Sequence, residues 1–252
     1  MSAPKSGRPD LDGQTALVTG AGGGIGTVVA ESLAVEGADV VAVDVDGASL
    51  DVVRDGVEDH GRTCETVHCD VTESADVHAL REAALAAFDS VEIVVTAAGV
   101  TSPTLSIEEP MAEWHEVLAT NLTGTFETCR AFFDHMVANE YGKIVTIGSI
   151  AGRTGRPQAG PSYAASKGGV HAVTRWLAVH GAEHAVYANA IAPGPIRTRM
   201  TEMGDTTTPD AQPLNRIGEP EDVAQAVVFL ASQQSHWITG AVLDLNGGQV
   251  MR

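Results

Sequence analysis

Short apolar runs alternate along the chain with longer stretches in which apolar residues return at helical spacing. The runs 15–19 (TALVT) and 39–43 (DVVAV) are apolar and rich in β-branched residues, which favours strands. Between them, the apolar residues of 25–36 fall on one helical face, and Gly37 ends that pattern. These three segments therefore predict two parallel strands joined by a helix.

The same alternation continues to the end of the chain. Further strands are predicted at 63–68, 91–96, 143–147, 186–191 and 241–245, and further helices at 48–59, 73–88, 111–139, 162–179 and 219–231. Strands this apolar, separated by helices, are typical of a parallel sheet that is buried on both faces. We predict one α/β domain over residues 11–252, a doubly wound, Rossmann-type parallel sheet of about seven strands, preceded by a flexible N-terminus at 1–10.

One long segment, 193–219, carries no regular pattern and includes the sequence GDTTTP. Loops of this length inside a compact domain are usually functional or mobile. We therefore expect a substrate lid near residues 194–215.

The net charge excludes some classes of binding partner, and the cysteine content indicates the redox compartment. The 252 residues include 15 Lys and Arg against 33 Asp and Glu, a formal net charge of −18, which would repel nucleic acid and anionic membrane surfaces. An odd number of widely spaced cysteines, Cys64, Cys69 and Cys129, indicates free thiols in a reducing compartment. With no apolar run of about 18 residues and no secretory pattern, we expect a cytoplasmic protein without a membrane partner.

A glycine-rich turn follows the first predicted strand, at residues 19–26 (TGAGGGIG). Glycines there let the backbone approach a pyrophosphate, whose charge the next helix N-terminus attracts. The spacing departs from G-x-G-x-x-G because Ile25 stands where the third glycine would be. The second strand, however, ends in Asp44, where a carboxylate can accept hydrogen bonds from an adenosine ribose and repel a 2′-phosphate. NAD is therefore favoured over NADP.

Tyr163 and Lys167 are separated by four residues near the start of a predicted helix, so both lie on one face. A fixed cation favours the phenolate form of tyrosine and lowers its pKa from about 10, which suits proton exchange with an alcohol. By itself this pair is a common arrangement of surface residues.

Several short motifs occur in a fixed order along the chain: Thr19–Gly26 (matching TGxxxGxG), Asp70-Val71, Asn121, Ser149, Tyr163-x-x-x-Lys167 and Pro193-Gly194. Together they resemble the short-chain dehydrogenase/reductase family, and the match extends from Leu11 to about Gly248. Each motif alone is a weak signal, whereas all of them in register are specific. The resemblance implies a nicotinamide-dependent oxidoreductase, commonly a homotetramer.

The resemblance also implies residue roles. Tyr163 would be the general acid/base, and Lys167 would lower its pKa and hold the nicotinamide ribose. Ser149 would hydrogen-bond the substrate oxygen, and Asn121 would hold a water in the proton relay behind Lys167. The implied cofactor-binding residues are Gly20, Gly24, Ile25, Gly26, Asp44, Asp70, Val71, Ala97, Ala98, Gly99, Tyr163, Lys167, Pro193, Gly194, Ile196 and Thr198.

One segment departs from the family pattern. The usual Asn-Asn-Ala-Gly after the fourth strand appears here as Thr96-Ala97-Ala98-Gly99. Because two side-chain amides are missing, we expect altered local hydrogen bonding and weaker cofactor affinity, with catalysis retained.

The main hypothesis is hydride transfer between NAD(H) and a secondary alcohol or ketone, a small-molecule substrate. The sequence does not identify that substrate; the segments expected to line its pocket carry Arg153, Arg156, Arg197 and Arg199. An alternative is an NADPH-dependent 3-oxoacyl-acyl-carrier-protein reductase, which the segment 213–223 (PLNRIGEPEDV) resembles. Repulsion of an acidic carrier protein and the choice of cofactor at Asp44 argue against it. A third alternative is an NAD(H)-binding sensor without turnover.

No metal site is expected. His180, Glu183 and His184 spell the H-x-x-E-H pattern of some zinc proteases, but Gly181 weakens a helix there. Cys64 and Cys69 have no matching distant pair that would complete a zinc site.

Overall fold

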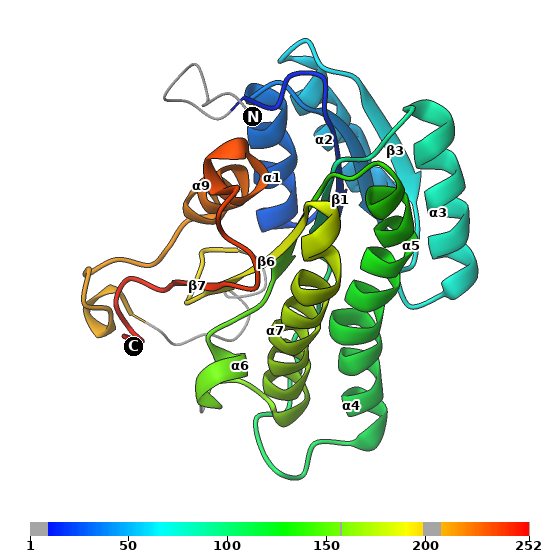
Figure 1. Ribbon diagram of the computed structural model, residues 1–252. Coiled ribbons are helices and arrows are strands. Elements are labelled where there is room, and N and C mark those ends of the chain that lie inside the picture. The colour runs from blue at the N-terminus through cyan, green and yellow to red at the C-terminus, as the bar shows by residue number, and fades with distance from the viewer. Residues whose placement is uncertain (1–9, 157, 199–207, 252) are drawn as a thin grey trace.

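The computed structural model describes residues 10–156, 158–198 and 208–251. Within them, parallel strands form one seven-stranded sheet in the order β3-β2-β1-β4-β5-β6-β7 (Figure 1). The strands are β1 (Thr15–Thr19), β2 (Asp39–Asp44), β3 (Cys64–His68), β4 (Ile93–Thr96), β5 (Gly142–Ile147), β6 (Val186–Pro193) and β7 (Val242–Leu245). The predicted doubly wound sheet in a single domain is confirmed.

Helices cover both faces of this sheet. They are α1 (Gly24–Val35), α2 (Gly47–Glu58), α3 (Ser74–Ala87), α4 (Met111–Leu118), α5 (Thr125–Ala138), α6 (Ala151–Thr154), α7 (Pro161–Gly181) and α9 (Pro220–Ala231). α1, α2 and α9 share one hydrophobic core, while α3, α5 and α7 share the core on the opposite face (Figure 1). No helix in the described part of the chain is long and apolar enough to cross a membrane.

The strands read as continuous apolar runs because both of their faces are buried. In β2, Val40 and Ala42 pack into the core beneath α1 and α9, whereas Val41 and Val43 point to the α3 and α5 side. All four side chains are fully buried. Burial of apolar surface on both faces stabilises the sheet and makes the strands visible in the sequence.

The strand order reverses at β1, which lies between β2 and β4. Such a reversal opens a crevice at the carboxyl ends of the two strands, where ligands of doubly wound proteins bind. Gly20 follows β1 with φ +67°, and a Cβ there would lie 2.6 Å from the backbone of Ala98, which follows β4. Only glycine allows the two loops to approach this closely.

The structure corrects several sequence predictions in detail. The predicted helix at 111–139 is interrupted between α4 and α5 by a π-helical turn, η1 (Ala119–Gly124). The short helix α6 and the 3-10 turns η2 (Ala182–His184), η3 (Pro209–Ala211) and η4 (Gln233–Ser235) were not predicted. Residues 199–207 of the expected lid and 1–9 of the expected flexible terminus lie outside the described residues.

Lys143 is buried at the start of β5 and provides a stability prediction. Its Nζ donates to the Ser235 hydroxyl at 3.2 Å and lies 3.9 Å from the ring centroid of Tyr187, and burial lowers its pKa to about 8. The unfolded state therefore binds more protons than the folded state between about pH 8 and 10.5, so the cost of burying the charge is largest below pH 8. We expect Lys143→Met to raise the free energy of unfolding at pH 7 by up to about 3 kcal/mol.

Urea denaturation of the wild type and Lys143→Met at pH 7 and pH 10 measures this difference in the free energy of unfolding. The gain should shrink at the higher pH, where wild-type Lys143 is neutral in the folded state. Ser235 keeps other partners because its hydroxyl also donates to the carbonyls of Leu230 and Ser232. A stabilisation of equal size at both pH values would contradict the assignment to the buried charge.

Candidate active site

A cavity of about 580 Å³ opens at the carboxyl ends of β1, β2 and β4, where the strand order reverses. This volume is ordinary for a site that holds a cofactor. The predicted cofactor residues that line it are Gly20, Gly24, Ile25, Gly26, Asp44, Asp70, Val71, Ala97, Ala98, Gly99 and Thr198. Glu116 and Thr120, which sequence reasoning missed, line it as well, because α4 and η1 pass beside the cavity.

The glycine loop at 20–26 presents the start of α1 to this cavity. No side chain caps the helix, whose N-cap is Gly23, so its first N–H groups are available to an anion. A Cβ at Gly26 would stand 2.0 Å from the Gly20 carbonyl oxygen, so the turn depends on a glycine there. This is the glycine that carries the close packing, one residue after Ile25.

Asp44 ends β2 and lines the same cavity. One carboxylate oxygen, Oδ2, accepts a hydrogen bond from Gly22 N at 2.9 Å, and the other, Oδ1, accepts one from Asp46 N at 2.9 Å. These bonds fix the carboxylate beside the glycine loop. A second negative charge placed next to it would be repelled.

Ser149, Tyr163 and Lys167 meet between the end of β5 and the first turns of α7. Tyr163 and Lys167 lie one turn apart, with Nζ of Lys167 at 5.8 Å from the phenol ring centroid. The same Nζ donates to the carbonyl of Ile147, the last residue of β5, at 2.8 Å. The Ser149 side chain lies close enough to Tyr163 to lower the pKa of its phenol. The structure thus brings three of the four predicted catalytic residues into one cluster.

The electrostatics of the cluster differ from the sequence expectation. Burial raises the pKa of Tyr163 above its ordinary value, and the nearby Ser149 side chain and the charge of Arg156 act against this rise. Burial also lowers the pKa of Lys167 to about 8. The expected net lowering of the phenol pKa is therefore not found in the protein by itself, because desolvation of the phenolate dominates.

Asn121, the fourth predicted residue, is buried in the π-helical turn η1. Its Oδ1 accepts from Val100 N at 2.8 Å, and its Nδ2 donates to Val100 O at 2.9 Å and to the Ser166 hydroxyl at 3.1 Å. A Cβ at Gly99 would lie 3.1 Å from that Oδ1 and 3.5 Å from Nζ of Lys167. Asn121 and Lys167 therefore flank the same glycine, and π-helical turns of this kind are frequent at functional sites.

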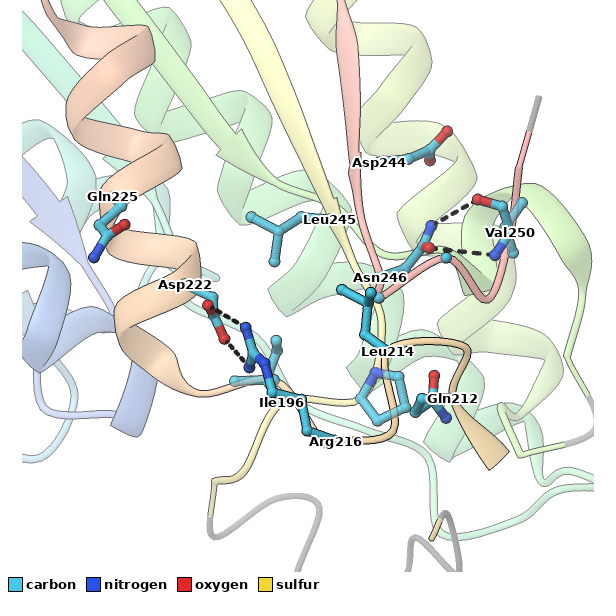
Figure 2. A pocket seen from close by; sticks show the side chains of 14 residues that line it. Ile196, Gln212, Leu214, Arg216, Asp222, Gln225, Asp244, Leu245, Asn246 and Val250 are labelled. Atoms are coloured by element: carbon cyan, nitrogen blue, oxygen red, sulfur yellow. Dashed lines mark hydrogen bonds and ion pairs between the residues drawn. The ribbon is translucent and has the colours of Figure 1, made fainter. Parts of the chain in front are cut away.

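The end of β6 holds the remaining predicted residues. The carbonyl of Pro193 accepts from Ile150 N at 3.0 Å, and Gly194 N donates to Leu245 O at 2.9 Å. Ile196 does not line the large cavity; it lines a second one of about 390 Å³ beside α9 and β7 (Figure 2). Of the two predicted cofactor-binding residues Ile196 and Thr198, only Thr198 borders the first cavity.

Sequence reasoning missed the anchor of the helix that carries Tyr163 and Lys167. The Glu109 carboxylate accepts hydrogen bonds from both the backbone N–H, at 2.9 Å, and the hydroxyl of Ser162 in the first turn of α7. An acidic group at a helix N-terminus is stabilising. Glu109 is 53 positions away from Ser162 in the chain, so no local pattern could reveal the contact.

The segment Thr96–Gly99, which departs from the family pattern after β4, has incomplete local hydrogen bonding. The hydroxyl of Thr96 is buried and has no hydrogen-bond partner within the described part of the protein. Ala98 N reaches the Thr19 hydroxyl only at 3.4 Å. The segment is therefore held mainly by backbone contacts and carries one unsatisfied hydroxyl.

The candidate metal ligands have other partners. His180 Nδ1 lies 2.8 Å from the Trp176 carbonyl, and its ring stacks on that of Trp176. His184 lies 3.5 Å from the adjacent Glu183. In residues 10–156, 158–198 and 208–251, no three His, Cys, Asp or Glu side chains are grouped so that they could hold a metal ion. The cysteines are buried free thiols, as predicted.

Comparison with known proteins agrees with this geometry. A family model described as enoyl-(acyl carrier protein) reductase matches residues 20–249. A galactitol 2-dehydrogenase (L-tagatose-forming) from Cereibacter sphaeroides is 39% identical, covering 94% of this chain and 95% of its own. The 3-oxoacyl-acyl-carrier-protein reductase FabG of Vibrio cholerae is 36% identical, covering 96% and 99%.

The same relationship is found among solved structures. A short-chain type dehydrogenase/reductase from Mycobacterium marinum superposes with a TM-score of 0.92 at 31% identity, covering 96% of this chain and 98% of its own. The agreement extends over the whole sheet and both layers of helices. The chain therefore belongs to the short-chain dehydrogenase/reductase family of oxidoreductases.

Proposed function

We propose that this oxidoreductase interconverts a secondary alcohol and a ketone with NAD(H). The observation that carries this proposal is the grouping of Ser149, Tyr163 and Lys167 next to Gly99, which lines the same cavity as Asp44. When bound, the cofactor supplies the hydride acceptor or donor. The protein side chains handle the proton and the position of the substrate oxygen.

In the oxidation direction, Tyr163 accepts the proton of the alcohol. The Ser149 hydroxyl, which lies near the Tyr163 phenol, donates to the same substrate oxygen and stabilises charge as it develops there. Lys167, held by the Ile147 carbonyl, favours the phenolate and would hold ribose hydroxyls of the bound cofactor. The Asn121 side chain donates a hydrogen bond to the Ser166 hydroxyl. Its proposed role is to hold a water molecule in the proton relay behind Lys167.

The residues around the large cavity fit a nicotinamide dinucleotide. The uncapped start of α1 suits a pyrophosphate, and Asp70 and Val71 line the same cavity, where they would contact an adenine ring. NAD is proposed over NADP because Asp44 offers a carboxylate to the ribose hydroxyls and repels a 2′-phosphate. The nearby Arg54 is paired with Asp51 at 3.1 Å and does not supply a free cation for such a phosphate.

A 3-oxoacyl thioester reductase is the second candidate, favoured by the relationship to the Vibrio cholerae enzyme. The segment 213–223, which resembles these reductases, includes Arg216. Arg216 forms an ion pair with Asp222 at 2.6 Å (Figure 2). That pair stabilises the start of α9 and leaves no unpaired Lys or Arg within 213–223 for an acidic carrier protein. The net charge of −18 opposes such a partner as well.

We also infer a homotetramer in the cytoplasm. Exposed apolar side chains support self-association: Trp176 and Val179 lie on the outer face of α7, and Leu243 lies on the edge strand β7. Light scattering at micromolar concentration should give four times the 26.1 kDa chain mass.

The test is NADH or NADPH formation followed optically across secondary alcohols, polyols, hydroxysteroids and 3-hydroxyacyl thioesters, at low and high salt. Turnover of free alcohols with NAD supports the proposal. Turnover confined to thioesters with NADP would establish the second candidate. Tight NADH binding without turnover of any class would favour the sensor hypothesis.

A further inference from the structure

Most arginines near the site are neutralised by carboxylates. Arg153 Nε lies 3.1 Å from Asp244, and Arg197 Nε lies 3.0 Å from Glu219. Arg199 is outside the described residues. Arg156 differs, because the described part of the chain places no carboxylate within ion-pair distance of it. In a protein with 33 acidic and 15 basic residues, an unpaired arginine beside the catalytic cluster needs an explanation.

Arg156 lies on the turn that connects α6 with α7, between Ser149 and Tyr163 in the chain. Gly155, with φ +56°, reverses the chain after α6, and the Arg156 carbonyl accepts from Ala159 N at 3.1 Å just before α7 begins. The positive charge of Arg156 acts on the Tyr163 phenol and opposes the rise of its pKa. A cation whose charge acts on this phenol would also attract an anionic group of a substrate bound at Tyr163.

Neutral amides hold the guanidinium in place. Nη1 donates to Gln249 Oε1 at 3.2 Å, and Nε donates weakly to Gln158 Oε1 at 3.4 Å. The segment that carries Gln249 is itself closed by Asn246, whose side chain bonds both the N–H and the carbonyl of Val250 at 3.2 Å (Figure 2). These contacts orient the cation, and within residues 10–156, 158–198 and 208–251 no carboxylate pairs with it, which is what a binding site for an anion requires.

We propose that Arg156 binds a carboxylate of the substrate, so that the enzyme acts on secondary hydroxy acids and the corresponding keto acids. This inference rests on the proposed function. The hydroxyl proton passes to Tyr163, and the hydride passes from the carbon that bears this hydroxyl to the nicotinamide. The carboxylate is unchanged. A carboxylate fits better than a phosphate ester because one guanidinium balances one negative charge, whereas a dianion would leave excess charge in an acidic protein.

The test compares each hydroxy acid with its uncharged primary amide. Suitable pairs are 3-hydroxybutanoate, gluconate and 4-hydroxycyclohexanecarboxylate, each beside its amide. For a pair that is turned over, we expect wild-type kcat/KM to favour the acid by about tenfold or more, and Arg156→Gln to remove most of that preference. Loss of the Arg156 charge also weakens activation of Tyr163, but that loss affects acid and amide equally, so the ratio isolates carboxylate binding.

Arg175→Gln is the matched control, because Arg175 lies exposed on α7 and the substitution removes the same charge away from the site. Its ratio of acid to amide should equal that of the wild type. An equal ratio in wild type and Arg156→Gln, or a preference for phosphate esters over carboxylates, would overturn the assignment.

A binding measurement separates failure of this inference from failure of the proposed function. Cyclohexanecarboxylate and cyclohexanecarboxamide cannot be oxidised at a hydroxyl, so their binding to the NADH complex is followed by cofactor fluorescence. Carboxylate binding that depends on Arg156, without turnover of any alcohol, would support the inference and reject the proposed function. Turnover of neutral alcohols without Arg156-dependent carboxylate binding would support the proposed function and reject this inference.

Discussion

Tyr163→Phe is expected to lower kcat by roughly 10²–10⁴-fold, the usual contribution of a positioned general acid/base. The variant removes only the phenol oxygen, so the ring packing in the first turn of α7 is kept. Cofactor affinity should change little, because the large cavity at the end of β1 is lined by other residues. Steady-state kinetics and NADH fluorescence titration on the same preparation measure both quantities.

Ser149→Ala provides the comparison within the same cluster. It removes one donor to the substrate oxygen and the influence of Ser149 that lowers the pKa of Tyr163, and should cost about 10²–10³-fold in kcat. If Tyr163→Phe kept near wild-type kcat, the proposed role of Tyr163 and the chemistry built on it would be wrong. Equal loss of turnover and of NADH binding would instead indicate a misfolded variant.

The pH profile follows from the direction of the Tyr163 pKa shift. Alcohol oxidation requires the deprotonated phenol, and burial raises the pKa of that group above its ordinary value. Oxidation by the wild type should therefore accelerate as pH rises through the alkaline range, while ketone reduction, which uses the protonated form, should not.

Asp44→Ala is expected to shift cofactor choice from NAD toward NADP. Loss of charge-assisted bonds to the ribose should lower kcat/KM with NAD by roughly 10–100-fold, and removal of the repulsion should raise kcat/KM with NADP. The ratio of the two constants is the measurement, since any general damage to the site cancels in it.

Asp44→Asn is the matched control for this substitution. The carboxylate also accepts from Gly22 N and Asp46 N, so alanine removes supports of the glycine loop together with the charge. The amide keeps the shape and one acceptor, and should therefore change the cofactor ratio with less loss of thermal stability. An Asp44→Ala variant that gained no activity with NADP would contradict this explanation of cofactor choice.

The local sequence determined much of this protein. Strands such as β2 could be located because burial on both faces demands an unbroken apolar run, and that demand is visible without a structure. Gly26 and the spacing of Tyr163 and Lys167 are equally local, since a tight turn and one helical turn depend on neighbours in the chain. Family resemblance then supplied the roles of residues that are far apart in the sequence.

Only the tertiary structure decided how the pieces act on one another. The raised pKa of Tyr163 depends on how much water the folded chain excludes, which no motif records. The anchoring of α7 by Glu109 and the orientation of Arg156 by Gln249 join segments 53 and 93 positions apart. Sequence patterns report which neighbours a residue has along the chain, whereas desolvation and charge pairing depend on neighbours in space.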